Sequence, residues 1–162
     1  MQNKAGNLRI LKKTRRKPAP GDIFVFQLES IKERFFFGRV IATDSTLGNA
    51  ENVVLFYIYR VYSHSKTLIP VLLPTELLLP PMGTNNLPWT RGYFEVVRSE
   101  QLETKDLLKL HCFYSAARKR YYDEYGHSLP APVEPVGSYG VHGLGAIDNE
   151  ISKALGVPPV AV

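Results

Sequence analysis

Few side chains in this sequence suit metal binding or nucleophilic catalysis. No two of the four histidines lie four residues apart, the spacing that places metal ligands together on one helix face. The histidines are His64, His111, His127 and His142. The single cysteine, Cys112, has no neighbour in sequence that would favour a reactive thiolate, so we expect a buried and inert thiol. The sequence therefore predicts neither a metal site nor a catalytic cysteine.

Two further segments contain residue types that occur in active sites. Residues 137–145 are rich in glycine, but they lack the preceding strand and the lysine of a phosphate-binding loop. We predict a turning loop there, in which His142 is the one histidine of interest. Asp123 and Glu124 form an acidic pair. General acid–base catalysis needs two carboxylates that face a cleft, and nothing in the sequence indicates such an arrangement. We therefore predict a protein that is not an enzyme, with no catalytic residue, no cofactor and no metal.

The positive charge of the chain is concentrated at its N-terminus. Residues 1–20 carry seven Lys and Arg side chains and no acid, whereas the remaining residues have a net charge of −2. The isoelectric point of 9.3 therefore reflects the N-terminal segment and does not indicate a basic face on the body. Pro18 and Pro20 favour extended backbone at the end of that segment. We predict a basic flexible arm over residues 1–19 and a single domain over residues 20–162.

The cysteine content and hydropathy indicate a compartment. One cysteine cannot form an internal disulfide, which suits a reducing environment. No segment approaches the roughly 18 apolar residues of a membrane span. We therefore expect a cytoplasmic protein.

Apolar segments in the first hundred residues predict strands. Residues 22–28, 34–42, 53–62 and 92–98 are rich in β-branched and aromatic side chains. The third of these segments is almost continuously apolar, which predicts a central strand buried on both faces. Gly38 lies inside the second and indicates a bulge or a close approach of another segment. We predict an α+β fold in which a twisted antiparallel sheet of about four to six strands comes early in the chain.

A helix is expected near residues 104–125, after the strands. Apolar side chains recur there at spacings of three and four: Leu107, Leu110, Tyr114, Ala117 and Tyr121. Thr104 would be its N-cap and Gly126 would end it. In an alternative interpretation the helix ends near Phe113, and residues 120–129 form a hairpin.

A second helix is expected near residues 148–155. Asp148 would be its N-cap, and Gly156 followed by two prolines would end it. The segment before it, residues 130–145, contains many glycines and prolines and is expected to be a long loop.

Two of the predicted strands form a recognisable pattern. The first opens with Pro20-Gly21-Asp22-Ile23-Phe24, and the second contains Phe37-Gly38-Arg39-Val40-Ile41. This pattern resembles the opening of the immunity protein 26 family of bacterial polymorphic-toxin systems. Weaker similarities at Trp89 with Gly92-Tyr93-Phe94, and at residues 147–156, extend the resemblance over most of residues 18–157.

The resemblance implies an immunity protein that neutralises a cognate toxin of a polymorphic-toxin or contact-dependent growth inhibition system. Its partner would be the C-terminal domain of that toxin, and it would act by protein–protein binding without catalysis. If the toxin is a nuclease, acidic side chains of the body are the expected contacts, because charge complementarity directs such complexes. These side chains are Glu29, Glu33, Asp44, Glu51, Asp123 and Glu124.

Two alternatives arise from other features. The basic arm and the nine tyrosines could belong to an RNA-binding module, because aromatic rings stack on bases. The Gly-Asp-Ile strand also resembles the opening of small-barrel ribonuclease toxins of toxin–antitoxin systems, in which Arg39 would lie near the active site. The slightly acidic body argues against RNA cleavage.

Overall fold

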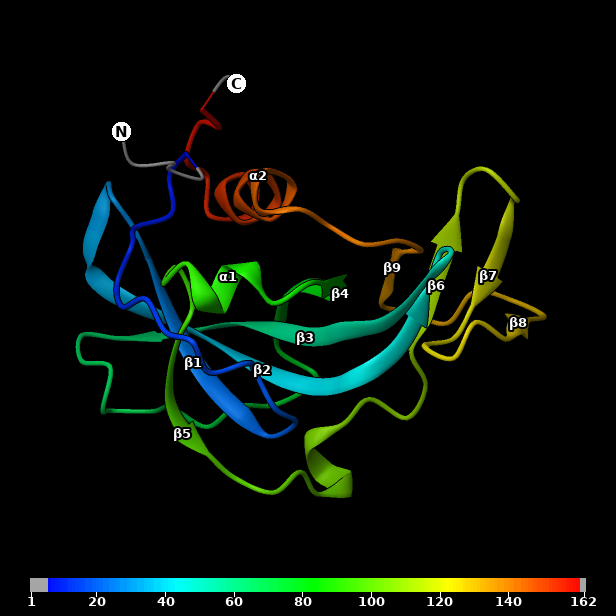
Figure 1. Cartoon of the computed structure of the whole chain (residues 1–162), viewed down its shortest axis with the longest axis horizontal. Coiled ribbons are helices and arrows are strands. Elements are labelled where there is room, and N and C mark those ends of the chain that lie inside the picture. The colour runs from blue at the N-terminus through cyan, green and yellow to red at the C-terminus, as the bar shows by residue number, and fades with distance from the viewer. Residues whose placement is uncertain (1–5, 161–162) are drawn as a thin grey trace.

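A five-stranded antiparallel sheet forms the larger part of the fold in the computed structural model, which describes residues 6–160. The strand order is β4-β3-β2-β1-β5, and the long strands β2 and β3 curve along the molecule (Figure 1). The prediction of an antiparallel sheet early in the chain is confirmed. The strands are β1 (Asp22–Leu28), β2 (Ile31–Leu47), β3 (Ala50–Ser63), β4 (Leu77–Thr84) and β5 (Glu95–Ser99).

A smaller mixed sheet lies beyond the turn between β2 and β3, at the right of Figure 1. Its strand order is β8-β7-β6-β9, with β6 and β9 parallel. These strands are β6 (Cys112–Ser115), β7 (Arg120–Tyr122), β8 (Ser128–Leu129) and β9 (Val136–Ser138). The helices are α1 (Leu87–Thr90) and α2 (Leu144–Ala154), and residues Thr104–Asp106 form one 3-10 turn, η1.

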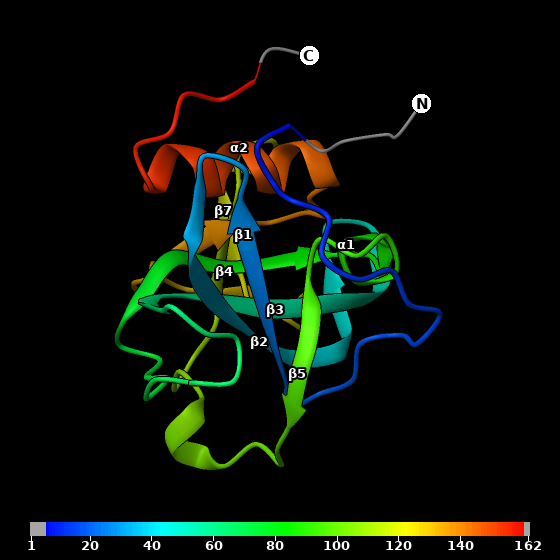
Figure 2. The ribbon, with the colours of Figure 1, turned by 90° about the vertical axis from the view of Figure 1, so that its left-hand side faces the viewer.

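Side chains of the large sheet alternate between two cores, one on each face. In β3, Val54, Phe56 and Ile58 enter the first core, and Val53, Leu55 and Tyr57 enter the second. The first core is covered by α1 and α2, and the second is packed against residues around η1 (Figure 2). Because both faces are covered, β3 is almost continuously apolar, as the sequence predicted for a central strand.

An aromatic cluster in the first core explains Gly38. The Phe24 ring stacks on Phe94, with centroids 4.4 Å apart, and meets Trp89 edge-on at 5.2 Å. A Cβ atom on Gly38 would overlap the Phe24 ring and would lie 2.7 Å from the carbonyl oxygen of Tyr57. The close approach predicted at Gly38 is therefore confirmed, and it lets Phe24 lie flat across the neighbouring strand.

The helix predicted over residues 104–125 is wrong. Only η1 is helical there, and strands β6 and β7 follow. The predicted stripe includes Leu110 and Tyr114, which are 36% and 37% exposed, whereas the core takes Phe113, which the stripe omits. Backbone pairing of β6 with β7 and β9 outweighs the helical spacing. The alternative hairpin over residues 120–129 is confirmed as β7 and β8.

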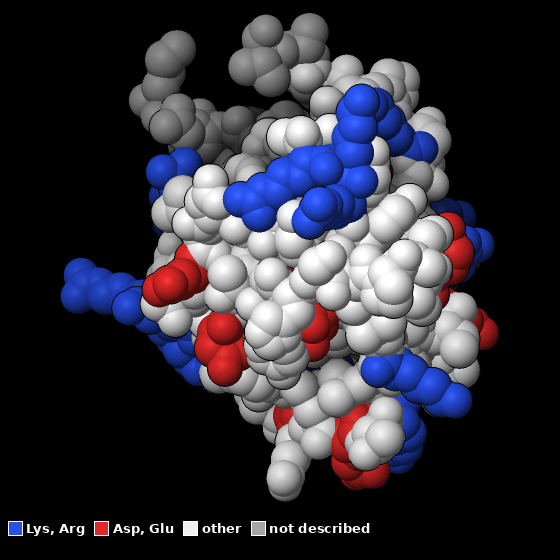
Figure 3. All heavy atoms as spheres, turned by 90° about the vertical axis from the view of Figure 1, so that its right-hand side faces the viewer, with Lys and Arg blue, Asp and Glu red and all other residues white. Residues whose placement is uncertain are grey.

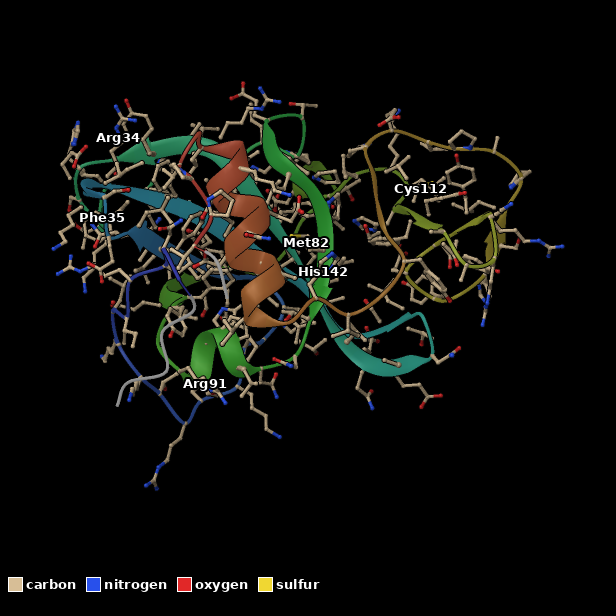
Figure 4. The ribbon with its side chains drawn as sticks, turned by 90° about the horizontal axis from the view of Figure 1, so that it is seen from above. Arg34, Phe35, Met82, Arg91, Cys112 and His142 are labelled. Atoms are coloured by element: carbon tan, nitrogen blue, oxygen red, sulfur yellow. The ribbon has the colours of Figure 1, made fainter. Side chains whose placement is uncertain are left out.

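The second predicted helix is present as α2, but it starts earlier than residue 148. Its N-cap is Gly143, so the prediction that Asp148 caps the helix is wrong. Asp148 lies instead inside α2, where it is buried and accepts a hydrogen bond from the Leu8 backbone N–H at 2.7 Å. Ile147 and Ile151 of the same helix enter the first core. Seen from above, α2 lies across the large sheet, with Met82 and His142 beside it (Figure 4).

The described part of the predicted arm, residues 6–19, runs beside β1. Leu8 is buried in the first core, and the Arg9 backbone N–H donates to the Gln27 carbonyl at 2.9 Å. The Leu11 backbone N–H donates to the Gly92 carbonyl at 2.7 Å. Residues 1–5 lie outside the described residues. The division into a flexible arm and one domain stays a prediction.

Replacing Gly38 with alanine tests the aromatic packing. The added methyl group has no space between the Phe24 ring and the Tyr57 carbonyl, so Gly38→Ala is expected to lower the free energy of unfolding by about 1–3 kcal/mol. Urea denaturation followed by circular dichroism measures the change. Gly140→Ala is the matched control, because a Cβ at Gly140 meets nothing within 4 Å. Equal stability of the two variants would contradict the packing described here.

Candidate functional site

Asp22, from the Pro-Gly-Asp-Ile pattern, is a buried structural hub. Arg16 donates to both carboxylate oxygens of Asp22, at 2.7 and 3.0 Å. The Ser99 hydroxyl donates at 2.6 Å and the Ala19 backbone N–H at 2.9 Å. Asp22 thereby joins the N-terminal segment, the start of β1 and the end of β5. Gly21 precedes it with φ +93°, a conformation that favours glycine. A side chain there would also overlap the Glu100 carbonyl.

The hydrogen bonds to Asp22 determine its protonation. Burial alone acts to raise the pKa of Asp22. The hydrogen bonds from Arg16, Ser99 and Ala19, together with the Arg16 charge, outweigh burial and hold that pKa below its ordinary value. Asp22 is therefore a carboxylate at neutral pH, fully engaged within the protein.

Arg39, from the Gly-Arg-Val pattern, is also buried. Its side chain is 5% exposed and pairs with Asp106 at 3.3 Å, and it donates to the Glu100 carbonyl at 3.1 Å. Tyr59 lies near this pair, and burial raises the Tyr59 pKa well above its ordinary value. Arg39 thus anchors the segment around η1 to the second core.

A buried hydrogen-bonded chain joins the two sheets. The Leu108 backbone N–H donates to the Tyr57 hydroxyl at 3.1 Å, and that hydroxyl lies 2.6 Å from His111 Nε2. His111 Nδ1 lies 2.8 Å from Glu124 Oε2. Every group is satisfied when Tyr57 donates to Nε2 and the His111 Nδ1–H donates to Glu124. Burial raises the pKa of Tyr57 to about 12, so its hydroxyl stays protonated as this arrangement requires.

The other histidines and Cys112 do not assemble a site. Among the residues that the structure describes, no group of three metal-ligating side chains comes together. His142 lies against the Gly83 carbonyl before α2, and Cys112 lies buried in the second sheet, apart from it (Figure 4). His64 and His127 are exposed. The expected burial of the thiol is confirmed.

The structure does not gather the six predicted acidic residues into one surface. Glu29 and Glu33 are exposed beside the β1–β2 turn, and Asp44 and Glu51 are exposed on the hairpin of β2 and β3. Asp123 and Glu124 lie in the second sheet and have internal roles. Asp123 accepts hydrogen bonds from the backbone N–H groups of residues 125 and 127, and Glu124 is hydrogen-bonded to His111.

Sequence reasoning did not identify the surface at the end of the β2–β3 hairpin. There the Thr46 backbone N–H donates to the Glu124 carbonyl at 2.8 Å, and Arg118 donates to the Asn49 side chain at 3.1 Å. These contacts bring the hairpin and the second sheet together. Figure 3 shows this end of the molecule, with a group of Lys and Arg side chains near its top and both acidic and further basic side chains below it. We call it the hairpin end, defined by Asp44, Glu51, Tyr114, Arg118, Tyr121 and Tyr125.

Tyrosines give the hairpin end its aromatic surface. Tyr114 and Tyr121 face each other across β6 and β7, with ring centroids 5.0 Å apart. Tyr114 is 37% and Tyr125 is 59% exposed. Tyrosine and arginine are the residue types most enriched at the energetic centres of protein interfaces. The clustering of tyrosines near residues 121–125 was the available sequence signal, but a single helix does not place Tyr114 and Tyr121 opposite each other on neighbouring strands.

A second exposed surface is apolar. The loop between β3 and β4 exposes Leu68, Val71 and Leu73, which have exposed fractions of 67%, 75% and 42%. The same loop packs Ile69 and Leu72 against the second core. Ile69 and Leu72 therefore hold the loop in place while the other three side chains face solvent.

The family model of immunity protein 26 matches residues 19–123, more than half of the chain. The chain belongs to the immunity protein 26 family. No curated protein and no solved structure gave a significant match. As a family member, the protein is a toxin-neutralising immunity protein and not an enzyme. The matched residues include Trp89 and Gly92-Tyr93-Phe94 but end before residues 147–156, so the resemblance there stays a prediction.

The two residue patterns that indicate the immunity protein 26 family are structural in this chain. Asp22 and Arg39 are both buried and paired inside the fold. The ribonuclease interpretation required Arg39 near an RNA substrate, but its charged group is paired with Asp106 and almost completely covered.

The RNA-binding interpretation required the basic arm and exposed tyrosines on one surface. The described arm residues lie beside β1 and β5, whereas the tyrosines of the second sheet lie at the other end of the molecule (Figure 1). In this immunity protein the two features therefore do not form a continuous RNA path. No described helix is long and apolar enough to cross a membrane.

Replacing Asp22 with asparagine tests the hub and its pH dependence. Because the folded-state pKa of Asp22 is lowered, its charge stabilises the fold above about pH 4 and that stabilisation is lost as the pH falls further. Asp22→Asn is expected to cost about 2 kcal/mol of unfolding free energy at pH 7. The difference from the native protein should shrink below about pH 4. Urea denaturation at several pH values measures it, with exposed Asp44→Asn as control.

Replacing Tyr57 with phenylalanine tests the chain between the sheets. The change leaves the buried Leu108 N–H and His111 Nε2 without their partner, at a cost of about 1–3 kcal/mol. Hydrogen exchange should show faster exchange of the Leu108 amide. Tyr125→Phe, at an exposed position, is the control. An unchanged Leu108 exchange rate in Tyr57→Phe would contradict this role.

Proposed function

We propose that the protein neutralises the C-terminal domain of a cognate bacterial toxin, delivered by contact-dependent inhibition or a related polymorphic-toxin system. Binding takes place in the cytoplasm of the cell that makes the immunity protein. Membership of the immunity protein 26 family is the observation that carries this proposal. The internal roles of Asp22 and Arg39 agree with it, because they leave binding to the surface.

We assign the toxin contact to the hairpin end. Exposed tyrosines there supply large contact area with few rotatable bonds, and Arg118 supplies a planar donor group. Asp44 and Glu51 lie on the hairpin at the same end and add negative charge. An aromatic centre bordered by charges of both signs has the composition typical of a specific protein interface.

A nuclease toxin fits this surface best. Nuclease domains carry positive charge where they hold the phosphate backbone. Asp44 and Glu51 are exposed and have no ion pair among the described residues, so they are available to meet that charge. Asp123 and Glu124 contribute negative potential from inside the second sheet. Occlusion of the nucleic-acid site would then neutralise the toxin.

The test uses the toxin domain encoded beside this protein in its genome. The native immunity protein should bind that domain and restore growth of cells that express it. Tyr114→Ala with Tyr125→Ala is expected to weaken binding at least tenfold, because truncating central tyrosines costs more than about 1.4 kcal/mol. Glu51→Lys should weaken it further by charge repulsion. Titration calorimetry measures the affinity.

The control replaces acidic residues at the opposite end of β2. Glu29→Lys with Glu33→Lys should leave affinity unchanged, because these residues are remote from the hairpin end. Failure of the native protein to bind and protect would refute the proposed function. If the tyrosine variant binds normally and Val71→Asp loses binding, the toxin contact lies instead on the loop between β3 and β4.

A further inference from the structure

Strand β5 has a free edge beside a cavity. It pairs only with β1 among the described strands, and its other edge forms no backbone hydrogen bond with another described segment. The N-terminal segment runs alongside and is held by Thr14, whose backbone N–H donates to the Thr90 carbonyl at 3.3 Å (Figure 2). Between them lies a cavity of about 370 Å³, lined by residues 95–99 and by Lys12, Thr14 and Arg16. We call this cavity the β5 groove.

An unpartnered donor lies at the β5 groove. Trp89 and Phe94 complete its lining. Trp89 is 1% exposed, and its indole N–H has no hydrogen-bond partner in the described structure. Buried polar groups are rarely left unpaired, and each exception calls for an acceptor. The tryptophan therefore indicates that an oxygen acceptor belongs in or beside the groove.

The charge of the β5 groove is positive. Lys12, Arg16 and Arg98 line it, and the only acid in the lining, Glu95, is paired with Lys66 at 2.9 Å. Arg16 is engaged with Asp22, and Arg98 forms an exposed ion pair with Glu100 at 3.2 Å, whereas Lys12 is exposed and has no ion pair among the described residues. A second copy of the chain would bring the same positive side chains together, so the charge disfavours self-association through this edge.

We propose that the β5 groove binds an extended acidic segment of a partner protein, which adds to the sheet as a strand beside β5. An edge strand presents alternating N–H and C=O groups, and another backbone complements both, whereas a phosphate group would satisfy only the donors. Acidic side chains of the segment meet Lys12 and Arg98, and one of its oxygens accepts from the Trp89 indole once the side chains that cover this indole move aside. The β5 groove is separate from the hairpin end, so peptide binding in the groove does not depend on where the toxin binds.

The sole tryptophan makes a direct test possible. The probe is the peptide acetyl-Glu-Val-Glu-Val-Glu-amide, titrated into the full chain while Trp89 fluorescence is recorded and calorimetry gives the affinity. A saturable fluorescence change is expected, because the probe contacts the only indole. A peptide with glutamine in place of glutamate should bind at least tenfold more weakly. No saturable binding of the acidic peptide up to millimolar concentration would overturn the proposal.

Backbone pairing is tested with two peptides that are N-methylated at alternate residues, in opposite frames. N-methylation at alternate residues removes the amide hydrogens along one edge of the extended peptide. The peptide that is methylated on the edge facing β5 should lose binding, and the other peptide should retain it. Equal binding by both would overturn strand addition. Tighter binding of an eight-nucleotide oligouridine than of the acidic peptide would show that the groove recognises nucleic acid instead.

Variants of the groove complete the test. Lys12→Glu with Arg98→Glu should weaken binding of the acidic peptide at least tenfold. Lys119→Glu, at the hairpin end, should leave the affinity for the peptide unchanged. Trp89→Phe keeps an aromatic ring in the core but removes the indole donor, and calorimetry should show several-fold weaker binding. Circular dichroism confirms that each variant is folded. Unchanged affinity in the Lys12→Glu, Arg98→Glu variant would refute the site.

Discussion

The carboxylate of Asp22 is the interaction on which the arrangement of this molecule depends. It belongs to β1 and receives hydrogen bonds from Arg16 and Ala19 of the preceding segment and from Ser99 of β5. Three parts of the chain are therefore held at one buried point. Without a charged acceptor there, the Arg16 guanidinium and the Ala19 N–H would lose their partner at the place where the first strand begins. Asp22 therefore ties the end of β5 and the N-terminal segment to the start of β1.

The large sheet could be predicted from the sequence because its signals are local. Continuous apolar runs with β-branched and aromatic residues identified β1, β2, β3 and β5. Strand β4 was not predicted, because Pro80 and Pro81 argue against a strand unless it lies at an edge. The second sheet was predicted only in part, through the alternative hairpin over residues 120–129 that corresponds to β7 and β8. Its strands are two to four residues long, too short for periodicity to register, and β6 pairs with β9, which is distant in sequence.

At the candidate site too, features of neighbouring residues could be predicted from the sequence, whereas contacts between distant segments could not. Charge and residue type selected Asp44 and Glu51, which are exposed, but could not show that Glu124 is bound to a histidine from another segment. Helical spacing placed Tyr114 and Tyr121 correctly on one face, yet the face belongs to a sheet. The pairing of Arg39 with Asp106 joins residues that are far apart in the sequence, and it has no sequence signature.

The family pattern in β1 and β2 lies inside the fold, whereas the surfaces that can meet a partner are built from turns and short strands at its ends. Gly21, Asp22 and Gly38 satisfy contacts between strands, and none of them borders the hairpin end. Partner specificity can therefore be exchanged without rebuilding the scaffold. With the toxin contact that we propose, exchanging the exposed residues of the β2–β3 turn and of the second sheet would redirect the protein to another toxin, while buried residues such as Phe113 stay the same.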